Sequence, residues 1–331
     1  MEKVKKFFRK RCGKIYGILQ SQYSKLRDKK FQEIQKRFGK KNPERVFYVI
    51  RNKDYKTGLM SYYNSVLGHI LYAKEHSYSP VIDMCNYRNT YLEQKDIGHE
   101  NSWEYYFCQP GNLELKEVYQ SRNVILSDGS ATHLASPRVL YEQYYRDPFK
   151  AEELFEIIGN VIPLKKEVQQ TIEQQYRKIF PEDARVLGVV CRGTDLLNFS
   201  CHSRQPSVRE LIAIAEEKME AWNCPYLFLA SDTDAAVKEF RAYFGEHVLT
   251  NTCQRYDRWK ERSGGSDSLG DVRFSRERDA YLRGLEYLTT LMLLSRCNCL
   301  TGTLIGSTVG AIGFNMGKFE EIEIIDRGIY E

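Results

Sequence analysis

The chain lacks several features that would mark a membrane, secreted or zinc-binding protein. It has no apolar run of the roughly 20 residues that a membrane-spanning helix needs. No continuous apolar core follows the first basic residues, so no secretory signal is predicted. Its nine cysteines include no C-x-x-C pair and have no framework spacing. We therefore expect reduced thiols, no metal site and a cytoplasmic location.

The size and charge of the chain point to two globular units without a nucleic-acid partner. Its 331 residues suit two domains of ordinary size, and no internal repeat or low-complexity tract interrupts them. The net charge is +5, but residues 1–41 hold 15 Lys or Arg against 3 Asp or Glu. The remainder is therefore acidic. A nucleic-acid enzyme would usually spread positive charge over its binding face.

Residues 1–41 read as a basic, amphipathic helical extension. Apolar residues recur every three or four positions, with Lys and Arg between them. Two interpretations remain open. The helix lies on an anionic membrane surface, which would make the protein peripheral at the inner face of the membrane. Alternatively, it is a solvated extension that packs on the body. The apolar positions are Val4, Phe8, Cys12, Ile15, Leu19, Tyr23 and Leu26.

Residues 42–165 predict a first α/β domain. Arg45–Ile50 reads as a strand, residues 59–76 as a helix with apolar positions on a helical period, and Ser79–Met84 as the next strand. A strand–helix–strand crossover implies parallel pairing. The following segment, 85–120, is polar and aromatic and is expected to form loops.

Residues 183–331 predict a second α/β domain with a more regular alternation. Strands are expected at 185–191, 225–230, 247–250, 298–301 and 322–325, with helices between them. Such alternation is typical of a doubly wound, Rossmann-like parallel sheet. Residues 254–278 are polar and Gly-containing, and we expect them to form a lid-like loop.

Polar side chains follow two buried strands of this second domain. Arg192 and Asp195 come directly after the apolar run Val186–Val190, and Ser231 and Asp232 follow the next strand. Open α/β sheets bind ligands at the carboxyl ends of their strands. An Arg there commonly holds a phosphate or carboxylate. The alternative is a structural Arg–Asp pair.

A glycine-flanked turn, Gly302–Gly310, opens the last apolar helix. Free amide groups at a helix start favour anionic oxygen, and Ser307 and Thr308 add hydroxyl groups. The alternative is close packing of helix on sheet. Together with Arg192 and Asp232, the turn favours a sugar nucleotide, with the diphosphate on the Arg and the helix start and the base or ribose on the carboxylate.

Three motifs in this order resemble the fucosyltransferase superfamily, which includes α1,2-, α1,6- and protein O-fucosyltransferases. Val190–Asp195 is similar to its His-x-Arg-Arg-x-Asp motif, Leu229–Asp232 to a strand that ends in two acids, and Leu291–Ala311 to its Ser-rich third motif. Thr57–Ser61 is similar to a glycine-rich opening. The chain departs from these motifs at Cys191, Gly193, Ser61 and Thr290.

The resemblance implies a GT-B-like fold, in which two Rossmann-like domains face a cleft. It implies an inverting, metal-independent transferase that moves fucose from GDP-fucose to a hydroxyl of a glycan or lipid-linked glycan, without a cofactor. A role in polysaccharide biosynthesis is then expected. The donor-binding residues would be Arg192, Ser231, Asp232, Thr303, Ser307 and Thr308, and the acceptor-side candidates are Ser61, Asn64 and His69.

A general base is needed to deprotonate the acceptor hydroxyl. Candidates are Asp195, His202 and, from the first domain, His69. Arg192 would stabilise charge on the leaving diphosphate.

Three other interpretations stay open. Asp232 and Asp234 could form a metal-binding D-x-D pair, as in manganese-dependent glycosyltransferases of another fold. The donor could be a different nucleotide sugar. The chain could also be a non-catalytic binding protein.

Overall fold

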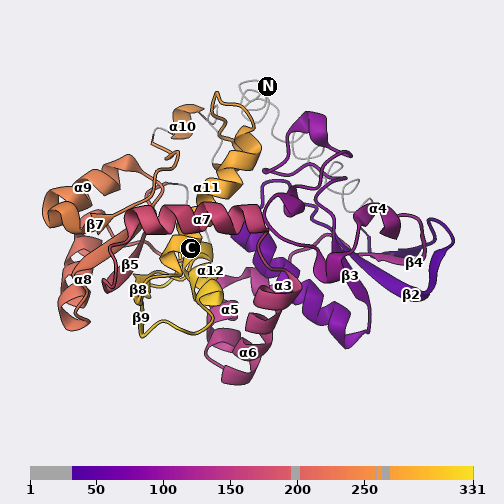
Figure 1. The fold of residues 1–331 in the computed structure, drawn as a ribbon, viewed down its shortest axis with the longest axis horizontal. Coiled ribbons are helices and arrows are strands. Elements are labelled where there is room, and N and C mark those ends of the chain that lie inside the picture. Colours follow the sequence, from indigo (N-terminus) through magenta and orange to yellow (C-terminus); the bar gives the residue numbers. More distant parts are fainter. Residues whose placement is uncertain (1–31, 195–201, 258, 263–268, 331) are drawn as a thin grey trace, which may run out of the picture.

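Two β-sheets, a mixed one in the N-terminal half and a parallel one in the C-terminal half, lie at opposite ends of an elongated α/β molecule, with helices between them (Figure 1). This architecture is seen in a computed structural model that describes residues 32–194, 202–257, 259–262 and 269–330. The predicted α/β fold with two Rossmann-like halves is thereby confirmed. Residues 1–31 of the predicted extension 1–41 lie outside the described residues. Within the described residues, no helix has the length and apolarity to cross a membrane.

The N-terminal sheet has the strand order β1-β4-β2-β3. Strand β2 pairs in parallel with both β3 and β4, as the crossover predicted. Strand β1 pairs antiparallel with β4, with Ile34 opposite Leu126. The last ten residues of the predicted helical extension are therefore not helical: they hold β1 and the start of β2. The bounds are β1 Ile34–Lys36, β2 Lys41–Ile50, β3 Ser79–Ile82 and β4 Ser121–Leu126.

The reason for this difference lies in pairing with a distant strand. The basic, amphipathic pattern continues through residues 32–41, so local periodicity still favours a helix there. The backbone of Ile34–Lys36 instead finds hydrogen-bond partners on β4, about 90 residues later. Edge pairing of this kind satisfies the backbone of a short strand and leaves its side chains exposed.

The C-terminal sheet has the strand order β7-β6-β5-β8-β9, and all of its pairs are parallel. The predicted strands are all present, with ends that differ by a few residues. Strand β5 is buried along its whole length, as its β-branched, two-sided apolar sequence predicts. The bounds are β5 Val186–Cys191, β6 Tyr226–Ser231, β7 Val248–Leu249, β8 Cys299–Gly302 and β9 Glu321–Ile324.

The helices fall into two groups. Helices α8 and α9 cover one face of the C-terminal sheet, where Leu187 and Leu229 pack against Leu211 and Phe240. The other helices of at least nine residues lie mainly between the sheets (Figure 1). The bounds are α3 Leu59–Glu75, α6 Pro148–Glu156, α7 Lys166–Ile179, α8 Val208–Ala221, α9 Asp234–Phe244, α11 Asp279–Leu294 and α12 Gly306–Asn315.

Short elements complete the chain. The loop-rich segment 85–120 contains single 3₁₀ turns and one short helix, as expected. The polar segment 254–278 contains a short helix and a 3₁₀ turn, Leu269–Asp271, on either side of residues outside the described part. Its role as a lid stays a prediction. The four-residue helices are α4 Leu115–Val118, α5 Pro137–Leu140 and α10 Trp259–Arg262.

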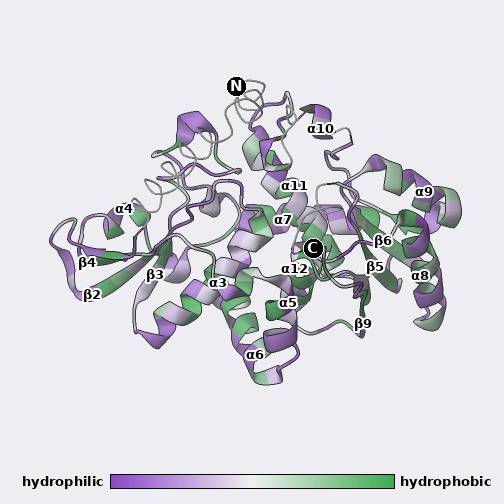
Figure 2. Ribbon diagram, turned by 180° about the vertical axis from the view of Figure 1, so that it is seen from behind, coloured by the Kyte–Doolittle hydropathy of each residue, from purple (hydrophilic) through white to green (hydrophobic). Residues whose placement is uncertain are grey.

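One apolar core joins the two halves of the molecule. It runs from Tyr48 and Ile50 on β2, through α3 and α12, to Val190 on β5. The apolar surfaces of these helices face inward, while polar residues cover the outside (Figure 2). The site described below therefore rests on elements that pack directly against one another. The predicted domain bounds, 42–165 and 183–331, remain a prediction.

Candidate functional site

The C-terminal sheet changes direction between β5 and β8. From β5 the chain proceeds outward to β6 and β7, and it then returns to add β8 and β9 on the other side. In open α/β sheets such a reversal of the strand order marks the place, at the carboxyl ends of the strands, where ligands bind. Arg192 follows β5, and the start of α12 follows β8. The two features predicted to bind an anion thus flank the same topological switch point.

The start of α12 lies against the start of α3 from the other half of the chain. A methyl group placed on Gly306, the first residue of α12, would lie 3.4 Å from Cβ of Met60, the second residue of α3. One turn later, a methyl group on Gly310 would meet the end of the same Met60 side chain. The glycines of this turn therefore do allow close packing, and the packing partner is a helix of the N-terminal half.

At these two helix starts, no N-cap or first-turn side chain offsets the positive end of the helix dipole. Among described helices of eight or more residues, only α3 and α12 have neither a side-chain cap from the N-cap residue nor an acidic residue in the first turn. A helix start carries partial positive charge and orphan amide groups. Two such starts side by side make an electropositive place that suits an anionic ligand.

Arg192 is anchored beside this place by Asp232. Its Nε lies 3.1 Å from Oδ2 of Asp232, and its side chain remains 19% exposed. The same carboxylate accepts hydrogen bonds from the Gly193 amide, at 2.8 Å, and from the Thr194 hydroxyl. Asp232 therefore holds the turn after β5 in shape. Its carboxylate was predicted to contact the base or ribose, but both oxygens are already engaged by the turn.

Glycine at position 193 is required by this arrangement. A methyl group there would lie 3.1 Å from both Cγ2 and Oγ1 of Thr233, which is tighter than most real contacts. The turn after β5 and the turn after β6 therefore touch through backbone and small side chains, which brings Asp232 within reach of three donors.

The other predicted donor-binding residues differ in accessibility. Ser307 is half-buried in the first turn of α12 and can contact a ligand. Thr308 is fully buried, and within the described structure its hydroxyl has no hydrogen-bond partner. Thr303 is buried and donates to Oε1 of Gln205 at 2.9 Å. Ser231 is buried within the turn after β6, where its hydroxyl accepts from the Thr233 amide. Only Arg192 and Ser307 of this set reach solvent appreciably.

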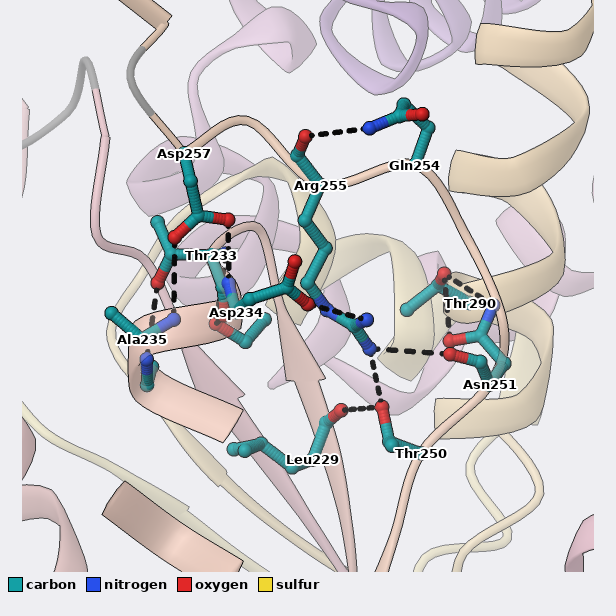
Figure 3. Close-up of polar contacts among 12 residues, drawn as sticks. Leu229, Thr233, Asp234, Ala235, Thr250, Asn251, Gln254, Arg255, Asp257 and Thr290 are labelled. Atoms are coloured by element: carbon teal, nitrogen blue, oxygen red, sulfur yellow. Dashed lines mark hydrogen bonds and ion pairs between the residues drawn. The ribbon is translucent and has the colours of Figure 1, made fainter. Parts of the chain in front are cut away.

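Asp232 and Asp234 do not point to a common place. Asp234 pairs with Arg255 at 3.2 Å (Figure 3), whereas Asp232 pairs with Arg192. Asp257 accepts hydrogen bonds from the amides of Asp234 and Ala235 and so caps α9. Among the described residues, no group of three or more His, Cys, Asp or Glu is placed to hold a metal ion. The D-x-D alternative therefore finds no support in this geometry.

Arg255 fixes the segment that crosses this edge of the sheet. Its side chain is only 9% exposed and donates to the Thr250 hydroxyl at 2.7 Å and to the Asn251 carbonyl at 3.2 Å (Figure 3). Asn251 in turn bonds to Thr290 of α11. Thr290 stands where the resemblance implies an acidic residue. Its side chain instead ties the segment after β7 to α11.

The acceptor-side candidates of α3 are mostly enclosed. His69 is buried, with Nδ1 3.1 Å from the Tyr48 hydroxyl and Nε2 3.2 Å from the Ser130 carbonyl. Burial lowers the pKa of His69, so the ring is neutral at pH 7. Asn64 is 1% exposed. Ser61, in the first turn of α3, is half-buried. His69 and Asn64 are thus enclosed, and among the described residues the Asn64 side chain has no hydrogen-bond partner, whereas Ser61 is more accessible; the acceptor role of all three stays a prediction.

The remaining base candidates are not resolved by this geometry. Asp195 lies outside the described residues. His202 is half-buried in a segment tied to the C-terminal tail, where its carbonyl accepts from the Tyr330 amide. The assignment of either residue as the base stays a prediction.

Sequence reasoning missed the residues of α11 and of the 85–120 loops that enclose the site. Burial raises the pKa of Tyr287 to about 12, and the charge of Arg192 opposes this shift. Tyr91 accepts a hydrogen bond from the Leu59 amide at 2.7 Å and therefore sits on the start of α3. Helical periodicity carries no information on which distant element a helix face meets, so it could not have identified these residues.

No family model matches the chain, and no curated protein matches it in sequence.

Similarity appears only among solved structures, at low identity. The chain is similar to the NodZ α-1,6-fucosyltransferase soaked with GDP-fucose, with 15% identity over 86% of this chain and 96% of that one, and a TM-score of 0.49. Fucosyltransferase NodZ from Bradyrhizobium gives 16% identity over 82% and 93% of the two chains, with a TM-score of 0.47. POFUT1 in complex with GDP-fucose gives 9% identity over 86% and 98%, with a TM-score of 0.45.

Proposed function

We propose that the chain is an inverting, metal-independent glycosyltransferase that moves fucose from GDP-fucose to a hydroxyl of a glycan or lipid-linked glycan. The observation that carries the proposal is the convergence of Arg192 with the uncapped start of α12 at the topological switch point of the C-terminal sheet. A guanidinium and a row of free amides at one edge of a sheet suit a diphosphate. The uncapped start of α3 adds positive potential from the other half.

The same groups suit the chemistry of nucleotide-sugar transfer. When the bond to the anomeric carbon breaks, negative charge develops on the leaving diphosphate, and fixed positive groups stabilise it. Arg192 is held in place by Asp232, so little reorganisation is needed at that moment. Inversion requires a base on the acceptor side, and Asp195 and His202 remain the candidates for it. The separate engagement of Asp232 and Asp234 supports a reaction without a bound metal.

Donor binding is the first test. Titration calorimetry should show binding of GDP and of GDP-fucose by the full chain, and weaker binding of UDP and UDP-glucose. Binding of UDP-sugars in preference to GDP-sugars would move the proposal to another donor. No binding of any nucleotide, together with no hydrolysis of GDP-fucose, would favour the non-catalytic alternative.

Metal independence needs a separate measurement. Release of GDP from GDP-fucose should continue at an unchanged rate after dialysis against EDTA. A rate that falls with EDTA and returns with Mn²⁺ would contradict the metal-independent mechanism.

Association with a membrane is a further part of the proposal. Because β1 begins at Ile34, a variant that lacks residues 1–31 keeps both sheets. That variant should lose sedimentation with vesicles of phosphatidylserine but keep its affinity for GDP. Equal sedimentation of both proteins would reject the membrane role.

A further inference from the structure

Arg283 of α11 is a buried cation with most of its hydrogen-bonding capacity unused. The residue is 5% exposed. Its Nη2 donates to the Leu269 carbonyl at 2.8 Å, whereas Nε and Nη1 have no partner among the described residues. No carboxylate of the described structure forms an ion pair with it, although neighbouring Arg276 binds both Asp279 and Glu286. The three N–H groups on Nε and Nη1 are therefore unsatisfied within the described part of the chain.

Such an arrangement is costly unless a ligand completes it. A guanidinium is always charged in proteins, so it cannot avoid the cost by losing a proton. Each buried donor without a partner costs about 1–3 kcal/mol, and more when it is charged. Proteins keep groups of this kind mainly where function requires them.

The position of Arg283 points to the candidate site. It lies four residues before Tyr287 on α11, so both side chains share one face of that helix. The charge of Arg192 acts on the phenol of Tyr287, and that of Arg283 on the phenol of Tyr91, whose hydroxyl accepts from the Leu59 amide at the start of α3. The turn whose Leu269 carbonyl accepts from Arg283 is also paired, through Asp271, with Lys56 just before α3. Arg283 therefore lies near the start of α3.

We infer that Arg283 and the start of α3 form a second oxyanion subsite, which takes a phosphate or carboxylate group on the N-terminal side of the candidate site. The identity of the ligand rests on the proposed function, in which Arg192 and the start of α12 hold the diphosphate from the C-terminal half. The turn Leu269–Asp271 holds Arg283 through the Leu269 carbonyl. The Lys56–Asp271 ion pair ties this turn to the N-terminal half.

Two sources could supply the oxyanion: the diphosphate of the donor or an acidic group of the acceptor. Calorimetry with inorganic pyrophosphate and with GDP distinguishes them, using the full chain and the variants Arg283→Met and Arg283→Lys. Arg278→Met is the matched control, because Arg278 is exposed at the start of the same helix and stacks on Tyr281.

If the subsite exists, Arg283→Met weakens pyrophosphate binding by about 10-fold or more, as expected for loss of a charged hydrogen bond. Arg283→Lys has a smaller effect and Arg278→Met has none. A parallel loss of GDP affinity assigns the subsite to the donor; unchanged GDP affinity assigns it to an acidic acceptor group. If the wild type binds pyrophosphate but not GDP, and Arg283→Met loses pyrophosphate binding, the subsite is kept and the fucosyl-transfer proposal is rejected.

A purely structural role gives a different result. In that case Arg283→Met and Arg283→Lys bind pyrophosphate and GDP like the wild type, and the inference is overturned. Thermal unfolding without ligand gives an independent readout. Removal of a cation with three unsatisfied donors should leave the melting temperature unchanged or raise it, because replacing a buried, poorly paired charge by an apolar group is often stabilising.

Discussion

The carboxylate of Asp232 holds together the turn on which the site depends, and its replacement by Asn is the sharpest test of that role. Asp232→Asn preserves the shape of the side chain but turns one acceptor oxygen into an NH₂ donor. That donor would face either the Gly193 amide or the pair formed by Thr194 and Arg192. Loss of one charged hydrogen bond costs about 1.5–3 kcal/mol. Arg192 also loses the opposite charge beside its Nε.

The expected total is therefore about 3 kcal/mol. Arg192 is partly solvated, so the cost stays below that of a fully buried unpaired charge, which reaches about 3–5 kcal/mol. For a domain of some 150–250 residues, 1 kcal/mol shifts the melting temperature by roughly 2–4 °C. Asp232→Asn should thus melt about 6–12 °C below the wild type. It should also bind GDP at least ~10-fold more weakly, because Arg192 is no longer held.

Differential scanning calorimetry and titration with GDP measure the two effects. Asp234→Asn is the control, since Asp234 belongs to the same D-x-D sequence but is 60% exposed and pairs with Arg255 instead. A surface pair of that kind contributes less than about 1 kcal/mol. If Asp232→Asn melts within 2 °C of the wild type, or if both variants behave alike, the reasoning about this turn is refuted.

Three other variants test separate parts of the structure. Arg192→Ala should lower fucosyl transfer by about 100-fold or more by loss of a charged transition-state donor, whereas exposed Arg209→Ala should not; equal rates would remove Arg192 from the mechanism. Burial lowers the pKa of His69 from 6.5, so below about pH 6.5 the unfolded chain binds a proton more readily than the folded chain, and the free energy of unfolding in urea should fall as the pH drops. His69→Gln should flatten this pH dependence, and an unchanged pH profile would contradict the reasoning. Gly284→Ala places a methyl group 2.1 Å from the Tyr106 hydroxyl and should lower the free energy of unfolding by about 1–3 kcal/mol, measured by thermal unfolding. A melting temperature equal to that of the wild type would show that α11 and Tyr106 pack less closely.

Much of the C-terminal half was predictable because its signals are local. The run Val186–Cys191 is apolar on both faces and β-branched, which is typical of a central parallel strand. Ser207 and Glu210 form the capping box that begins α8. Since parallel strands end at one edge of a sheet, Arg192, Asp232 and the α12 start could be assigned to the same edge before any coordinates were seen.

The structure departs from the local sequence signal where contacts with distant residues decide. Residues 32–41 have a helical apolar period but pair with β4. His69 has the chemistry of a base but lies between Tyr48 and Ser130. Neither outcome can be read from nearby residues, because each depends on a partner at least 20 positions away.

By itself, the sequence determined which residue types stand at the ends of the strands and which segments become strands and helices. Only the tertiary structure decided that Asp232 serves Arg192 and its turn, that α3 and α12 begin side by side, and that Nε and Nη1 of buried Arg283 have no partner among the described residues. The physical reason is that periodicity and propensity act over a few residues, whereas burial and charge compensation depend on whatever the fold brings into contact.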